Sequence, residues 1–342
     1  MPSIDLLLIG FGAVHRAFSH ILLYKAEALA RRYDLTLRVV GVADSSGARF
    51  RAEGFDLATL LAHKTAGEGV STFPGGQPAP GALALAQIAS YDILCEASPV
   101  NLRDGDPGLS CARAGLRRGK GVVLANKAPL VLDFRGLHEL AQRHGAGLAF
   151  SATVCGGLPV INVGRRDLIA AEIHLIEGIF NSTSNYILSR MTAGETYAAA
   201  LAEAQRRGIA ERDPSLDVEG WDAANKLVIL ANTLLHFPAT LDAVSVQGIT
   251  ALSRDDLLAA QRRGQVIKLL ARAEQVDDGY RLSVTPQPVP AGSFWAGVSD
   301  WQMGIAFHTD IYEEIYLKID ERGPTATAAA MLRDLIHLAG AA

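Results

Sequence analysis

The first 150 residues alternate short apolar runs with longer segments of helical periodicity. The run IDLLLIG at residues 4–10 ends in glycine and predicts a buried strand. Residues 15–33 predict a helix, because apolar side chains recur at the spacing of one helix face, at Phe18, Ile21, Leu22, Ala26 and Leu29. Later segments predict buried strands at 37–46, 91–99 and 121–127, a helix at 108–120 and a loop at 65–81. This alternation predicts an α/β fold with a parallel, doubly wound sheet.

After about residue 150 the pattern becomes that of an α+β domain. Strands of a mixed or antiparallel sheet are predicted at 172–180, 279–289 and 313–319. Helices are interleaved with them at 181–191, 195–208 and 220–235. The last segment, residues 325–342, predicts a helix that packs back on the first domain. We therefore expect two domains, over residues 1–150 and 151–320.

Composition restricts the class of protein. With 342 residues, of which 49% are apolar and 20% charged, the chain can bury a large core. Its net charge of -4 provides no basic surface for nucleic acid. No apolar run is long enough to span a membrane, and the N-terminal run is too short for a signal peptide. The three cysteines, Cys95, Cys111 and Cys155, lack the spacing of a zinc site, which favours the reducing cytoplasm.

The turn after the first strand is typical of a dinucleotide site. In IGFGAVH, Gly10 permits a tight turn, and Gly12 lets a pyrophosphate approach the backbone where the helix begins. The third glycine of the usual pattern is replaced by His15, and a plain strand-to-helix turn is the alternative. The motif predicts a Rossmann-type first domain whose cofactor-binding residues include Gly10, Gly12, Ala13 and Val14.

Two strand ends carry further candidates for this site. Asp44 ends the second strand, where a carboxylate accepts hydrogen bonds from a ribose 2′-hydroxyl and repels a 2′-phosphate. This favours NAD over NADP, although Arg49 and Arg51 are near in sequence and a strand-end acid facing water is the alternative. Lys127 closes the fourth strand, and ligands of open sheets bind beyond the carboxyl ends of strands. A solvated loop residue is the commoner fate of such a lysine.

An acidic stretch precedes a helix that turns apolar. Residues 211–232, ERDPSLDVEGWDAANKLVILAN, place five acids ahead of one lysine, namely Glu211, Asp213, Asp217, Glu219 and Asp222 before Lys226. Asp222 and Lys226 are four residues apart and share a helix face. As an exposed pair they would contribute only a few tenths of a kcal/mol. The acidic stretch is therefore either a solvated surface turn or a site that holds a small zwitterion.

Six segments make the sequence resemble the homoserine dehydrogenase family over nearly its full length. They are GFGAV, EASPVNLRDGDPGLS, GKGVVLANKAPL, SATVCGGLPVI, GIFNSTSNYILSRM and AERDPSLDVEGWDAANKLVILA. The resemblance implies the reversible reduction of L-aspartate 4-semialdehyde to L-homoserine with NAD or NADP, a step toward threonine and methionine. It also implies a short form of the enzyme, because no C-terminal regulatory domain fits in the remaining length.

The resemblance implies roles for individual residues. The catalytic lysine of the family falls on Lys226 and its second active-site lysine on Lys127. Positions that bind, support or approach the substrate fall on Glu211, Asp222, Asp217 and Thr183. Ser98 falls beside the nicotinamide half of the cofactor. The family can also hold a sodium ion through carbonyl oxygens, which would be those of Val154, Gly156 and Leu158, and its members pair their second domains, so a homodimer is expected.

The chemistry of this reaction explains why these residue types are needed. Hydride that arrives at an aldehyde carbon makes an alkoxide, and an ammonium beside that oxygen stabilises the charge and delivers a proton. Two lysines in one pocket would repel each other and lower the pKa of one of them toward working pH. Carboxylates such as Glu211 would bind the substrate ammonium.

Departures from the family pattern keep other functions open. Ser182 replaces a glycine, Ser151 replaces a glutamate of the cation loop, and the segment KIDERGPTATAAAM replaces a glycine-rich one. A related enzyme for another small aldehyde or alcohol, or a non-catalytic dinucleotide-binding regulator, is therefore an alternative. A semialdehyde dehydrogenase would use Cys155 as a nucleophile. His308 either faces the site or is structural, and the structural role is favoured.

Overall fold

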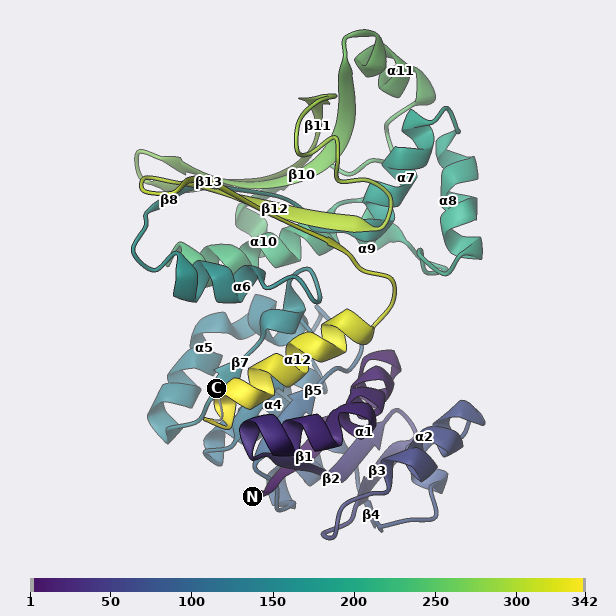
Figure 1. Ribbon diagram of the computed structural model, residues 1–342, viewed down its shortest axis with the longest axis vertical. Helices are drawn as coiled ribbons and strands as arrows, with labels where there is room; N and C mark the ends of the chain where they lie inside the picture. The colour runs from purple at the N-terminus through teal and green to yellow at the C-terminus, as the bar shows by residue number, and fades with distance from the viewer. Residues whose placement is uncertain (1–2, 341–342) are drawn as a thin grey trace. The chain divides into compact units, whose positions relative to one another are not determined.

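The computed structural model describes residues 3–340, which form two compact units (Figure 1). The first unit has two segments, one that runs up to Gly157 and a C-terminal one that begins at Gly323. Leu158–Arg322 form the second unit. The last two residues of the helix predicted at 325–342 lie outside the described residues.

The first unit is a seven-stranded sheet flanked by helices. Its strand order is β4-β3-β2-β1-β5-β6-β7, and the five strands from β2 to β7 in this order are parallel. Strands β3 and β4 add an antiparallel edge, and β4 lies inside the segment predicted as a loop. The elements are β1 (Ser3–Ile9), α1 (Ala13–Tyr33), β2 (Thr36–Asp44), β3 (Gly47–Phe50), α2 (Leu57–Thr65), η1 (Val70–Thr72), β4 (Gln77–Ala79), α3 (Ala82–Ile88), β5 (Ile93–Glu96), α4 (Gly108–Arg117), β6 (Gly121–Leu124), α5 (Ala128–His144), β7 (Leu148–Ala149), η2 (Ser151–Thr153) and α12 (Thr325–Leu338).

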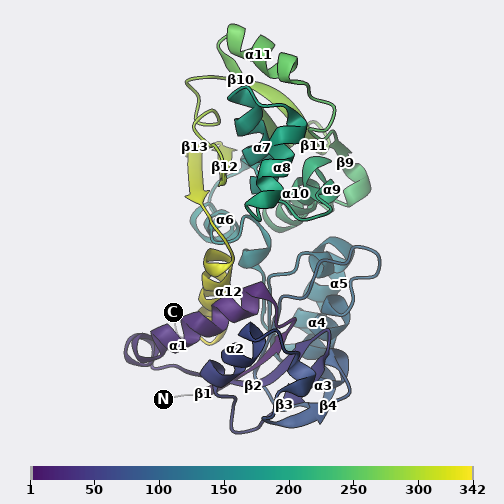
Figure 2. The same ribbon diagram turned by 90° about the vertical axis from the view of Figure 1, so that its right-hand side faces the viewer.

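Helices cover both faces of this sheet, α1 and α12 on one and α3, α4 and α5 on the other (Figure 2). Strand β1 is buried on both faces, which explains its uninterrupted apolar run. The core beneath α1 and α12 includes Leu8 of β1, Phe18 of α1 and Leu335 of α12, all fully buried. The C-terminal helix therefore belongs to the core of the first unit.

The second unit contains a six-stranded sheet in the order β13-β12-β8-β10-β11-β9. Its pairs are antiparallel except for β9 with β11. The elements are α6 (Val160–Asn162), the π-helical turn η3 (Val163–Asp167), β8 (Ile173–Ile179), α7 (Ser182–Thr192), α8 (Tyr197–Arg206), α9 (Ser215–Val218), α10 (Trp221–Leu234), η4 (Leu241–Ala243), β9 (Val244–Val246), α11 (Arg254–Arg262), β10 (Gln265–Val276), β11 (Gly279–Pro290), β12 (Gln302–Thr309) and β13 (Glu313–Asp320).

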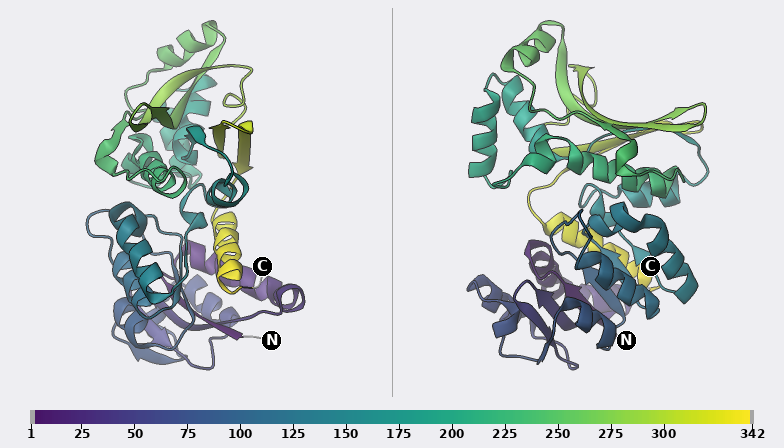
Figure 3. Two further views of the ribbon diagram at one scale, coloured as in Figure 1. Left: turned by 90° about the vertical axis from the view of Figure 1, so that its left-hand side faces the viewer. Right: turned by 180° about the vertical axis from the view of Figure 1, so that it is seen from behind.

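Helices α7 and α10 lie on one face of this sheet (Figures 1 and 3). Helix α10 is buried on most of its circumference, including the polar Asp222 and Asn225, as expected for a helix inside a core. The predicted α/β fold with a second α+β domain is confirmed. Several elements were not predicted, among them β3, β4, α2, α3, α5, α11, β10 and β12.

Candidate active site

The turn that follows β1 is closed by a contact that only glycine allows. Gly10 has φ +82°, and a Cβ placed on it would lie 2.4 Å from the Ser98 backbone nitrogen. Ser98 comes just after β5, the parallel neighbour of β1. The Gly10 and Phe11 amides donate to the Ala43 carbonyl at the end of β2, over 2.9 and 2.8 Å. The turn thus joins the carboxyl ends of three strands.

The N-terminus of α1 fits a pyrophosphate. Gly12 caps the helix without a side-chain hydrogen bond, and the first turn holds no acid. A Cβ on Gly12 would meet no atom nearer than 3.9 Å, so the approach to the backbone is open. Amides in the first turn of a helix, here those of Ala13 and Val14, have no intrahelical acceptor and attract anions.

His15 occupies the position where the usual motif has its third glycine. Its ring is fully buried near Phe11 and Phe18, and Nδ1 donates to the Gly10 carbonyl over 3.0 Å. Burial lowers the pKa of His15 to about 4, against the raising effect of this hydrogen bond. The side chain is therefore neutral at pH 7, and its hydrogen bond to the Gly10 carbonyl holds the turn.

Asp44 is held by several donors at the end of β2. Its Oδ2 accepts from Lys64 Nζ at 2.6 Å and from the Val70 amide at 3.1 Å, and its Oδ1 accepts from the amide and hydroxyl of Ser46. Burial raises the pKa of Asp44, but the bonds from Lys64 and Ser46 outweigh it and keep the pKa below its ordinary value. Asp44 is thus an anion with an ammonium beside it, and Lys64 was not predicted.

A second polar cluster lies at the carboxyl ends of β5 and β6. The Ser98 amide donates to Glu96 Oε1 at 2.8 Å, Asn126 Nδ2 lies 3.4 Å from Ser98 Oγ, and Asn126 Oδ1 caps the Ala128 amide at 2.9 Å. Glu96 is fully buried, and burial raises its pKa to about 7 although Ser98 and Asn126 lower it. Lys127 occupies the N-cap position of α5, next to this cluster in sequence.

In the second unit, Asn181 binds two carboxylates, and one of them also binds Lys226. Its side-chain oxygen caps α7 at the Ser184 amide, and its Nδ2 donates to Asp217 Oδ1 at 2.7 Å and to Asp222 Oδ2 at 2.8 Å. Lys226 Nζ donates to Asp222 Oδ2 at 2.7 Å and to the Phe180 carbonyl at 2.5 Å. The Lys226 and Asp222 side chains are 13% and 10% exposed, so this pair is not a solvated surface pair.

Two carboxylates and one ammonium give this cluster an excess negative charge. Burial and then the Asp222 charge raise the pKa of Asp217, while the hydrogen bond from Asn181 and the Lys226 charge lower it. Thr183 Oγ1 donates its one proton to the Ile209 carbonyl at 3.1 Å. Glu211, by contrast, is exposed. Asn181 was not predicted as a site residue, although the NST segment that contains it was.

The loop from Val154 to Leu158 turns sharply, because Cys155 and Gly156 both have φ +54°. The Leu158 carbonyl accepts from the Val160 amide at 2.8 Å. Ser151, which replaces a glutamate of the family, donates from its amide and hydroxyl to the buried Asp334 of α12, over 2.7 and 2.5 Å. A carboxylate from α12 thus lies at Ser151, three residues before this loop.

The surroundings of Cys155 and His308 bear on the alternative roles considered above. The Cys155 side chain is fully buried. His308 lies on β12 between two carboxylates, with Nε2 3.4 Å from Glu177 and Nδ1 3.3 Å from Glu314. Within residues 3–340, no cluster of three or more His, Cys, Asp or Glu side chains is arranged to hold a metal ion, and no helix is long and apolar enough to cross a membrane.

A sequence model of the family described as homoserine dehydrogenase matches residues 159–336, more than half of the chain. The chain belongs to the homoserine dehydrogenase family. It is 36% identical to the homoserine dehydrogenase of Methanocaldococcus jannaschii over 335 residues, which cover 98% of each chain. It is 35% identical to the NAD(+)-dependent homoserine dehydrogenase of Pseudomonas canavaninivorans over 340 residues, covering 99% of this chain and 97% of that one.

Structural comparison agrees with membership of the homoserine dehydrogenase family. The crystal structure of a putative homoserine dehydrogenase from Archaeoglobus fulgidus matches with a TM-score of 0.88 and 36% identity, covering 98% of this chain and 99% of that one. The predicted family, fold class and oxidoreductase activity with a nicotinamide dinucleotide are therefore confirmed. The individual site residues remain predictions.

Proposed function

We propose that this protein interconverts L-aspartate 4-semialdehyde and L-homoserine, and that Asp217, Asp222 and Lys226 form the substrate end of its active site. The network that joins these three side chains through Asn181 carries the proposal. Its excess negative charge suits the α-ammonium of an amino-acid substrate. Thr183 and the exposed Glu211 are assigned to the same substrate.

Lys226 is assigned as the proton donor. When bound, the reduced nicotinamide supplies hydride to the aldehyde carbon, and the carbonyl oxygen becomes an alkoxide. The Lys226 ammonium, oriented by Asp222 and the Phe180 carbonyl, stabilises this charge and gives the oxygen its proton. In the reverse direction the neutral amine takes the proton from homoserine. Lys127 is assigned as the second active-site lysine, since it begins α5 beside the cluster of Ser98 and Asn126.

The dinucleotide is assigned to the first unit, with its pyrophosphate at Gly10–Val14 and its nicotinamide half beside Ser98. The open backbone at Gly12 and the uncapped N-terminus of α1 support this assignment. We propose a preference for NAD, because the Asp44 carboxylate would repel a 2′-phosphate and accept hydrogen bonds from a ribose 2′-hydroxyl.

The role of Lys226 is tested by homoserine-dependent reduction of NAD and NADP. Lys226→Ala should lower kcat by two to four orders of magnitude, the usual contribution of a positioned acid or base, while the Kd for NADH is unchanged. Lys318→Ala, which removes an exposed lysine of β13, is the matched control. Normal turnover in Lys226→Ala would refute the assignment. Turnover with another small alcohol, but not with homoserine, would instead favour the alternative substrate.

The NAD preference is tested at Asp44. In Asp44→Ala, the ratio of kcat/KM with NAD to that with NADP should fall by about tenfold or more, since a charge-assisted hydrogen bond contributes about 1.5–3 kcal/mol. Glu53→Ala is the control, because Glu53 is an exposed acid of the same region. An unchanged ratio would mean that Asp44 does not select the cofactor, and that its bond to Lys64 is its whole role.

Three further assignments rest on the family resemblance together with single features. We propose a sodium ion at the carbonyls of Val154, Gly156 and Leu158, supported by the sharp loop turn. A comparison of melting temperatures in sodium chloride and choline chloride at equal ionic strength tests this site.

We propose a homodimer through the second unit, whose sheet has one face free of α7 and α10. Light scattering tests the dimer. We propose a cytoplasmic location, supported by three free buried cysteines and tested by cell fractionation.

A further inference from the structure

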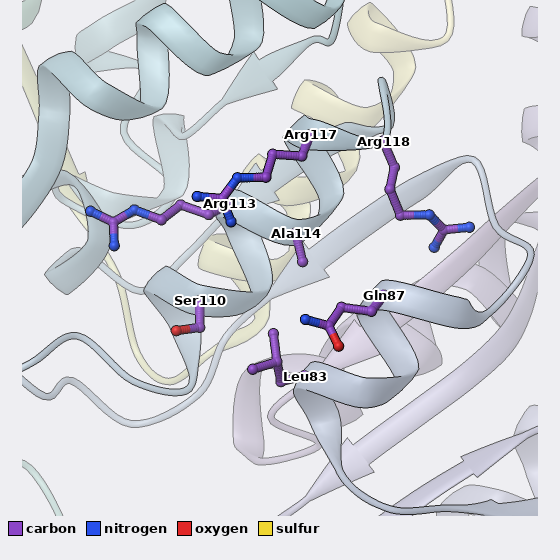
Figure 4. A pocket seen from close by; sticks show the side chains of 7 residues that line it. All are labelled: Leu83, Gln87, Ser110, Arg113, Ala114, Arg117 and Arg118. Carbon is purple, nitrogen blue, oxygen red and sulfur yellow. The ribbon is translucent and has the colours of Figure 1, made fainter.

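A groove of about 350 Å³ lies between α3 and α4 in the first unit (Figure 4). Its walls are Leu83 and Gln87 of α3, a face of α4 with Ser110, Arg113, Ala114 and Arg117, and Arg118, which caps the end of α4. This volume falls in the range of pockets that hold small molecules. None of the residues assigned to the dinucleotide or the substrate lines it.

The polar lining of the groove consists of side chains that can donate hydrogen bonds. Three arginines, one serine and one glutamine contribute to the lining, and no acidic residue does. Arg113 is ion-paired with Asp133, so the excess positive charge of the lining comes from Arg117 and Arg118, in a protein whose net charge is -4. Such a lining matches a ligand that accepts hydrogen bonds and carries negative charge.

Two of the arginines are held in place before any ligand arrives. Arg113 donates to Asp133 of α5 at 2.6 Å, and Arg118 donates to the Ala86 carbonyl at 2.8 Å with its guanidinium over the Tyr91 ring. The side chain of Arg117, which lies between them in sequence, makes no hydrogen bond or ion pair with any of residues 3–340. Figure 4 shows Arg113 and Arg117 directed to one side of the groove and Arg118 to the other. The anchored pair lowers the ordering cost of binding and leaves Arg117 available.

The dipole of α4 explains only part of this arrangement. Basic residues in a last helix turn are stabilised by the helix dipole, and Arg117 is the final residue of α4. Arg113, however, lies in the middle of the helix and four residues from Arg117, a spacing at which like charges repel. Asp133 offsets part of that repulsion at Arg113, and a bound anion would offset it further at Arg117.

The groove lies away from the predicted dinucleotide turn. Helix α4 follows β5 and leads into β6, which begins at Gly121, so its last turn with Arg117 lies toward the amino ends of the parallel strands. The turn at Gly10 lies at their carboxyl ends. We propose that the groove between α3 and α4 is a second anion site, which binds a small phosphate-bearing molecule.

The probe is inorganic pyrophosphate, titrated calorimetrically into the whole protein with saturating NADH present to occupy the dinucleotide turn. The wild type should bind one pyrophosphate per chain with an affinity that falls as salt rises. Arg117→Glu should weaken binding at least tenfold. Arg262→Glu is the matched control, because Arg262 is the exposed last residue of α11 and its reversal changes the net charge and the helix-end charge equally.

The outcomes separate the proposal from its rivals. Equal loss in Arg117→Glu and Arg262→Glu would show a general charge effect and overturn the site. Absence of saturable binding of pyrophosphate to the wild type would overturn the site as well. If a citrate titration gave binding where pyrophosphate gave none, the assignment to a phosphate-bearing molecule would be overturned. Unchanged turnover of homoserine by Arg117→Glu, combined with lost pyrophosphate binding, would support a site separate from the catalytic one.

Discussion

Replacing Glu96 by glutamine should stabilise the first unit at alkaline pH and not at acid pH. Glu96 is fully buried at the end of β5, and its Oε2 has no hydrogen-bond partner among residues 3–340. Burial raises its pKa from 4.5 to about 7. The folded protein thus holds this proton more tightly than the unfolded chain does, so the contribution of Glu96 to stability is greatest below pH 4.5 and is lost as the pH rises through 7.

The size of the effect follows from the two pKa values. Their difference corresponds to about 3 kcal/mol at full ionisation, and about 2 kcal/mol of it develops between pH 5 and pH 8. Glutamine keeps an acceptor for the Ser98 amide but cannot ionise. The unfolding free energy of Glu96→Gln should therefore gain about 2 kcal/mol on the wild type over this pH interval.

The assay must observe the first unit by itself. All three tryptophans, Trp221, Trp295 and Trp301, belong to the second unit, so their fluorescence does not report on Glu96. Hydrogen exchange of peptides from β5 and β6, read by mass spectrometry at pH 5 and pH 8, observes the right strands. The wild-type to variant ratio of opening constants should rise about 30-fold between the two values, since 1.4 kcal/mol is a factor of ten.

Glu139→Gln, at a half-exposed site on α5, supplies the control and should show no such change. If the Glu96→Gln ratio were the same at pH 5 and pH 8, the carboxyl would not be held with a raised pKa. The reasoning from burial would then fail.

Two further variants test single contacts. Asn181→Ala should raise the KM for homoserine about tenfold with little effect on the Kd for NADH, because it removes the amide that fixes Asp217 and Asp222; steady-state kinetics with homoserine varied would show it. An unchanged KM would contradict this role. Asp334→Ala should cost about 1–3 kcal/mol, because it leaves Ser151 with unpaired buried donors; hydrogen exchange in α12 measures the loss, and wild-type protection there would count against it.

The alternation of apolar runs predicted much of the first unit, because strands buried on both faces, such as β1, have a distinctive sequence. Strand β10 was missed because charged residues interrupt its apolar pattern. Lys268 is 4% exposed and donates to the Val298 carbonyl at 2.5 Å, and Arg272 pairs with Glu177 at 3.0 Å. These partners come from elements distant in sequence, so the local sequence pattern around β10 does not predict that its charged residues are paired.

The site shows the same division. The spacing of Asp222 and Lys226 predicted a shared helix face, and the structure brings them together. Lys64 and Asp334 escaped prediction, since their partners lie 20 and 183 positions away in the sequence. A pattern within one helix is readable before folding, whereas pairs of this kind exist only once the sheet has assembled.

The placement of α12 has a consequence for how the protein is made. The ribosome releases this helix after every other described element, yet its Met331 and Leu335 fill the core beneath β1 and α1, which emerge first. Until α12 has been synthesised, the nascent first unit exposes the apolar surface that α12 later covers, while the intervening second unit already has all of its sequence. A nascent chain of this kind is expected to need shielding by chaperones at its oldest end.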